Sequence, residues 1–278
     1  MKTIEGIAVA VLFASPIYAD FSYEVTRHGD AQKVVTKHYL RGERMVVDNG
    51  ETATVFDLGA KTVTTIDRVR KTYMVRSFAQ MRSMAAQSAG GQAMVDVKET
   101  GQTKTIAGFG ARQIMMTVHV DAPGGQPGST IETEVEMWVS DEVPGANELR
   151  AFYVRNADAF PWAALSDASG AAAESMANAQ RKIAKIGGVP MLAITRRKMI
   201  GGPEPSPTQK KQLESARAKL QAMAASGGQQ GLAAQDALRR LAAESAPQPD
   251  EVTESSGFSI SAIPASVFGV PAGFAPGQ

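Results

Sequence analysis

The segment from Ile114 to Val139 has the sequence IMMTVHVDAPGGQPGSTIETEVEMWV. Apolar side chains occupy every second position of its two arms, and this alternation is typical of strands with one buried face and one wet face. The polar stretch 123–129 is rich in Pro and Gly and predicts a turn between the arms. We therefore expect a long antiparallel hairpin. Its apolar positions are Ile114, Met116, Val118 and Val120 in the first arm, and Ile131, Val135, Met137 and Val139 in the second.

The residues upstream of this hairpin predict more antiparallel strands. From 20 to 76, short alternating runs are separated by turn residues, and the pair Asn49-Gly50 is typical of a tight type I′ hairpin. About six strands fit into this region, which leaves no room for crossover helices. The first part of the chain should therefore form an antiparallel meander.

Helical periodicity appears in four places. We expect helices over 77–89, 144–162 and 166–186, with a strand over 189–200 after them. The segment 201–257 carries two further helices with narrow, Ala-rich apolar stripes, and residues 258–263 then return to strand. The predicted class is therefore α+β, an antiparallel sheet covered by helices with a helical insertion before the last strand.

The first nineteen residues are typical of a cleavable export signal. An apolar run over 7–14 is too short to cross the roughly 30 Å hydrocarbon layer, and the small residue Ala19 precedes Asp20. The alternative is a buried N-terminal strand or helix. We expect residues 20–278 to form one exported, periplasmic domain that does not span the membrane, because no other apolar run is long enough.

Composition excludes several classes of function. The chain has 278 residues with 29 Lys and Arg, 28 Asp and Glu, and a net charge of +1, so we expect no nucleic-acid partner. It has no cysteine, which excludes disulfides, thiolate metal sites, cysteine nucleophiles and a lipidated N-terminal Cys.

The polar residues give weak support for catalysis. His28, His38 and His119 form no metal-ligand motif, and the sequence from Gly108 to Gln113 lacks the third glycine and the helix of a phosphate loop. Glu132, Glu134 and Glu136 suit the wet face of a strand better than a calcium site. We expect no metal, no cofactor and no enzymatic activity, although an acid/base pair that sequence does not reveal would make the protein a hydrolase.

Thirteen methionines are a more informative feature of the composition. Methionine is flexible and polarizable, so it fills irregular gaps in a core and also lines cavities that accept varied apolar ligands. Core filling is the simpler interpretation of this pattern.

Six short motifs stand out along the chain: Tyr39-Leu40-Arg41-Gly42-Glu43-Arg44-Met45, Lys71-Thr72-Tyr73, Ile106-Ala107-Gly108-Phe109, Met137-Trp138-Val139-Ser140, Gly188-Val189-Pro190 and Phe268-Gly269-Val270-Pro271-Ala272-Gly273-Phe274. With the order of the expected elements, they resemble an uncharacterised bacterial family of exported domains related to the lipoprotein carriers LolA and LolB. The resemblance covers about 20–200 and the last twenty residues.

The resemblance implies a strongly curved half barrel whose helices cap an apolar cavity, with a lipid or another apolar molecule as ligand. The insertion 201–257 departs from the compact carriers, and residues 206–246 would dock an envelope protein if the sheet core were solid instead. The cavity candidates are Ile114, Met116, Val118, Ile131, Val135, Met137, Met176, Ile183 and Ile186.

Overall fold

One large sheet dominates the computed structural model, which describes residues 20–28, 33–87, 93–121, 129–156, 160, 170–201, 207–245 and 250–277. The strands are β1 (Phe21–His28), β2 (Lys33–Arg41), β3 (Arg44–Asp48), β4 (Thr52–Asp57), β5 (Thr62–Asp67), β6 (Thr72–Ser77), β7 (Ala93–Ile106), β8 (Phe109–Asp121), β9 (Ser129–Ser140), β10 (Val189–Gly201), β11 (Glu251–Ser259) and β12 (Ala275–Pro276). The helices are α1 (Phe78–Gln87), α2 (Ala146–Asn156), α3 (Gly170–Ile186), α4 (Pro207–Ala225) and α5 (Gly228–Ser245), with a short 3₁₀ turn at Ala265–Phe268.

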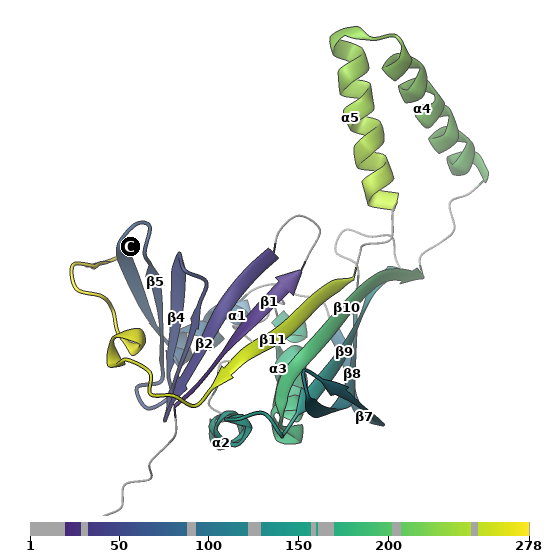
Figure 1. Cartoon of the computed structure of the whole chain (residues 1–278). Helices are drawn as coiled ribbons and strands as arrows, with labels where there is room; N and C mark the ends of the chain where they lie inside the picture. Colours follow the sequence, from purple (N-terminus) through teal and green to yellow (C-terminus); the bar gives the residue numbers. More distant parts are fainter. Residues whose placement is uncertain are drawn as a thin grey trace, which may run out of the picture.

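Two antiparallel meanders make up this sheet. Strands β1 to β6 follow one another from the centre to one edge, and β11 to β7 follow one another from the centre to the other edge. The meanders join where β1 pairs with β11, and the short β12 adds a parallel strand beside β6. The result is an open, curved sheet, with the hairpin of α4 and α5 standing beyond the ends of β10 and β11 (Figure 1). The predicted α+β class and the helical insertion between strands are confirmed at this level.

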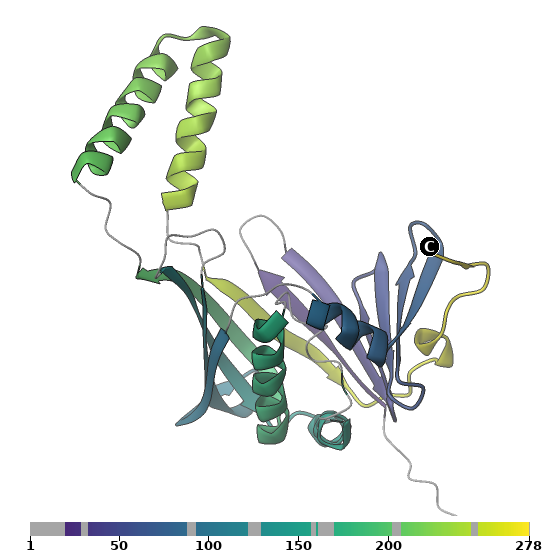
Figure 2. The same cartoon turned by 180° about the vertical axis from the view of Figure 1, so that it is seen from behind.

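Helices α1, α2 and α3 lie on one face of the sheet, which we call the inner face (Figure 2). On β1 to β5 this face is closed by a cluster in which Phe21, Phe56, Phe152 and Phe160 are all buried. Gly145 lies directly against Phe21 and has a φ of +87°, a backbone conformation that favours glycine. The inner face is therefore packed tightly where α2 begins.

Some predicted boundaries were wrong. Strand β11 begins at Glu251, so the inserted helices occupy less than 201–257, and the residues after Ser259 leave the sheet instead of forming a strand over 258–263. The reason is that Ile263 packs on the opposite, outer face, where its backbone N–H donates a hydrogen bond to Asp20. The predicted export signal lies outside the described residues, as do 157–159 and 161–169 of the predicted helices.

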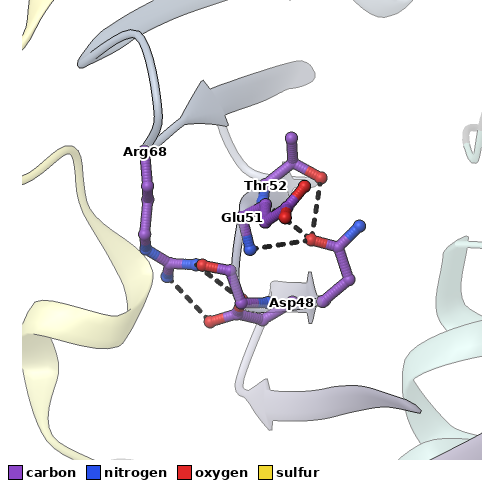
Figure 3. Close-up of polar contacts among 6 residues, drawn as sticks. Asp48, Glu51, Thr52 and Arg68 are labelled. Atoms are coloured by element: carbon purple, nitrogen blue, oxygen red, sulfur yellow. Dashed lines mark hydrogen bonds and ion pairs between the residues drawn. The ribbon is translucent and has the colours of Figure 1, made fainter. Parts of the chain in front are cut away.

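The predicted turn at Asn49-Gly50 is present, but it is not the tight type I′ turn. Only Gly50 of the pair has a positive φ, and the loop runs from Asn49 to Thr52. The Asn49 side chain accepts hydrogen bonds from the backbone N–H groups of Glu51 and Thr52, at 3.1 and 2.7 Å. Arg68 donates two hydrogen bonds to the carboxylate of Asp48, at 2.6 and 2.7 Å (Figure 3). Hydrogen bonds to the side chains of Asn49 and Asp48 therefore hold this loop, in which Gly50 has a positive φ and Asn49 does not.

The C-terminal segment covers the outer face of β3 to β5. Phe268 and Ile263 are buried there against Val46 and Ile66. Asp20 accepts hydrogen bonds from Arg41 Nε at 2.7 Å and from the backbone N–H of Ile263 at 2.5 Å, while Arg41 also donates to the carbonyl of Ile263. This network ties the start of β1 to the C-terminal segment.

We expect Asp20→Asn to lower the free energy of unfolding by about 2 kcal/mol at neutral pH, because it removes charge-assisted hydrogen bonds from a mostly buried carboxylate. The Arg41 hydrogen bond lowers the pKa of Asp20 from 3.8, so this stabilisation is present above that pH and is lost as the pH falls through the folded-state pKa. Urea unfolding of both proteins at several pH values measures the difference. A gap that stays constant into acid would contradict this account.

Candidate functional site: the inner face of the sheet

Small side chains lie on the inner face where the two meanders meet. Val25 on β1 is half-buried and packs on the inner side against the core cluster, and its partner across the β1–β11 ladder is Ser255. Thr253, two residues away on the same face of β11, pairs with Ala193 of β10. Thr36 of β2 pairs with Val25 on the other side. We call these five residues the groove floor.

All five residues of the groove floor are half-buried. They lie on the face on which the helices pack, and their side chains are shorter than the aromatic and long aliphatic side chains around them. Large apolar side chains pack beside the floor, with Phe21 and its neighbours at one end of it along β1 and the residues under α3 along one side. Small, half-buried side chains between packed apolar clusters suit a shallow groove, and we refer to this part of the inner face as the groove.

The α3 wall contains eight of the nine residues that the sequence singled out as cavity candidates. Of these eight candidates, Ile114, Met116 and Val118 are buried, and the other five keep some exposure. Ile131 lies further along β9, opposite Met199, and is outside the cluster. The eight are Ile114, Met116, Val118, Val135, Met137, Met176, Ile183 and Ile186. Their shared face is confirmed, and their contact with a ligand stays a prediction.

A polar corner borders the groove floor at His38. Its ring stacks on Tyr23 at a centroid distance of 4.7 Å, and a 3.2 Å hydrogen bond joins its Nε2 to Thr36 Oγ1. Burial lowers the pKa of His38 to about 4, so the ring is neutral at physiological pH although it keeps part of its surface exposed.

Two tyrosines add further uncharged groups to this corner. Burial raises the pKa of Tyr153 on α2 to about 12, and its hydroxyl lies 3.6 Å from Met45 Sδ. Burial, with a smaller contribution from Tyr153, also raises the pKa of Tyr23. The corner therefore presents neutral side chains to the groove at pH 7, which suits an apolar molecule and does not suit a bound anion.

The three glutamates of β9 belong to the outer face, as the alternation predicted. Arg196 of β10 lies 3.4 Å from Glu134 and 3.1 Å from Glu136, and Lys198 lies 2.6 Å from Glu132. Within the described residues no group of His, Cys, Asp and Glu side chains is arranged to hold a metal ion. These carboxylates are therefore partners of basic residues on the neighbouring strand.

The sequence around Gly108 forms the turn between β7 and β8. Ala107 and Gly108 both have positive φ, and the strands pair on either side of them. Four residues later, Arg112 donates hydrogen bonds to the carbonyls of Ile186 and Gly187, at 2.7 and 3.1 Å. This contact fixes the C-terminal end of α3 on the sheet, and with it the apolar wall of the groove.

Helices α4 and α5 pack chiefly against each other. A hollow follows one exposed side of α4 and is lined by polar residues such as Thr208, Lys211 and Gln212. That hollow has a single helix as its wall, so it encloses little. Among the described residues, no helix combines the length and the apolar character needed to cross a membrane.

Comparisons with known proteins add little. No family model matches the sequence, and no curated protein matches it. The solved structure described as "Structure of PNGF-II in C2 space group" aligns with a TM-score of 0.35 and 8% identity. The alignment covers 93% of this chain and 30% of that one, so this chain spans about a third of that chain's length. Similarity this low carries no argument about fold or function.

The residues of the groove floor were missed by sequence reasoning. Ser255 and Thr253 belong to the polar sequence EVTESSGFS, in which no apolar alternation marks a strand. Ala193 and Thr36 are small residues in ordinary strands. A space between larger residues has no signal in sequence until the pairing of strands distant in the chain is known.

Proposed function

We propose that the protein binds an apolar ligand, such as a lipid acyl chain, in the groove on the inner face and catalyses no reaction on it. The observation that supports this function is the floor of small, half-buried side chains between two packed apolar walls. The predicted resemblance to exported lipoprotein carriers favours the same function. On this proposal the protein acts in the periplasm as a carrier or as an envelope factor, and its curved sheet serves as a half barrel.

The energetics of such a groove are sufficient for useful affinity. Each methylene buried from water contributes about 0.8 kcal/mol, so sixteen of them contribute about 13 kcal/mol, and an association cost of about 5 kcal/mol leaves about 8 kcal/mol. His38, Tyr23 and Tyr153 are neutral at pH 7, so a bound acyl chain meets no charge at these side chains. We therefore expect dissociation constants in the micromolar range for long-chain ligands.

The test has two parts. Solvent extracts of the purified protein, analysed by mass spectrometry, should contain a co-purifying lipid at near-stoichiometric amounts. The emptied protein should bind a fluorescent fatty acid, cis-parinaric acid, saturably and with one site. Extracts without lipid together with unsaturable binding would show that the groove is not a ligand site.

A further inference from the structure

Two arginines point to the inner face at one end of the groove, where β1 ends and β11 begins. Arg27 of β1 pairs with Thr253 in the β1–β11 ladder, so it lies on the same face as Val25 and the groove floor. Arg197 of β10 stands between Arg196 and Lys198, whose side chains reach the outer-face glutamates. Alternation places Arg197 on the inner face. We call this end of the groove the mouth.

Both arginines are exposed, and neither forms an ion pair with any residue of the described chain. By strand geometry their Cα atoms are about 17 Å apart, two strand spacings across and four residues along. One acidic residue, Glu251, pairs with Thr195 and so shares their face, between β1 and β10. It is half-buried and forms no ion pair in the described part of the chain either. Together, the two arginines and Glu251 give the mouth a net charge of +1.

The opposite end of the groove is closed and apolar. Phe21 and Phe56 are buried there against Phe152 of α2 and Phe160. The ring centroids of Phe152 and Phe160 lie 6.0 Å apart, and those of Phe56 and Phe160 lie 5.4 Å apart. An elongated ligand on the groove floor would thus have the packed aromatic cluster beyond one end and the two exposed arginines at the other.

This polarity fits an amphiphile. We infer that the groove binds a lipid with an anionic head group, whose acyl chain lies on the groove floor and whose head group sits at the mouth beside Arg27 and Arg197. The inference rests on the proposed function and adds the chemical class of the ligand. Guanidinium groups suit this role because they bind carboxylates and phosphates through paired N–H donors. The carboxylate of Glu251 repels the same anionic head group.

The test compares two probes that differ only in charge, cis-parinaric acid and its methyl ester, on the full chain. Arg27→Gln and Arg197→Gln should each weaken binding of the acid about fivefold, the effect of one exposed ion pair, and together about twentyfold. Binding of the ester should not change. Glu251→Gln should strengthen binding of the acid. Lys33→Gln is the matched control, because Lys33 is an exposed cation at the same end of the sheet on the outer face.

The outcomes separate this inference from the function it rests on. Equal loss for acid and ester in the double variant, or no loss for either, would overturn the head-group assignment while the groove remained a ligand site. A loss in Lys33→Gln as large as in the arginine variants would also overturn it, because general electrostatic attraction would then explain the effect. Failure of the wild-type protein to bind either probe would overturn the proposed function itself.

Discussion

Replacing Gly145 with alanine is expected to lower the free energy of unfolding by about 3 kcal/mol or more, a large fraction of the stability of a typical domain. Gly145 has a φ of +87°, and a Cβ atom there would lie 2.0 Å from Cδ2 of Phe21. Phe21 is fully buried in the cluster that closes the inner face, so its ring has no free space to move into. Backbone strain and overpacking therefore add at one position.

Gly50→Ala separates these two effects. Gly50 has a φ of +92°, almost the same as that of Gly145, but a Cβ atom there would meet nothing within 4 Å. This variant should lose only the strain, about 1 kcal/mol. Urea unfolding of the wild type and both variants measures the difference. Equal losses in the two variants would mean that the contact with Phe21 has no energetic weight.

Filling the groove is expected to abolish ligand binding. Ser255→Trp introduces an aromatic side chain, which buries 150–250 Å² in a typical core, on the groove floor between β1 and β10. We expect the affinity for cis-parinaric acid to fall more than tenfold, because the indole occupies the space that the acyl chain needs. Fluorescence titration measures the affinity, and thermal unfolding shows whether the variant is folded.

The neighbouring residue provides the control. Ser256 follows Ser255 on β11, is exposed, and pairs with Glu24 on the outer face. Ser256→Trp adds the same side chain to the same strand but outside the groove, so it should bind the probe like the wild type. Ala193→Leu, a smaller intrusion on β10, keeps the test valid if Ser255→Trp fails to fold. Full binding by a folded groove-floor variant would place the ligand elsewhere.

Alternation in the sequence predicted much of the sheet. In the hairpin from Ile114 to Val139, every second residue faces α3, and the observed ladder pairs Ile114 with Met137 and Met116 with Val135. Such patterns are informative because a shift of one residue would expose the whole apolar set. The second half of strand β7 has no such signal in the sequence, because it is polar, mostly exposed and carries no apolar period.

The groove was beyond what the sequence predicts. It depends on the pairing of β1 with β11, whose residues are more than 220 positions apart, with two helices inserted before β11. Arg27 and Arg197 likewise become neighbours of one opening only through that pairing. Local periodicity predicts which face of a strand a residue occupies. The residue opposite it on the neighbouring strand is known only from the tertiary fold.

The most direct test of the central claim is to locate a bound chain in a crystal of the full protein. A fatty acid brominated near its methyl end gives an anomalous bromine signal whose position is independent of any assumption about the site. We predict that signal between α3 and the inner faces of β1, β11 and β10, near Val25 and Ser255. A bromine peak on the exposed side of α4, or at the outer face of the sheet, would contradict the account.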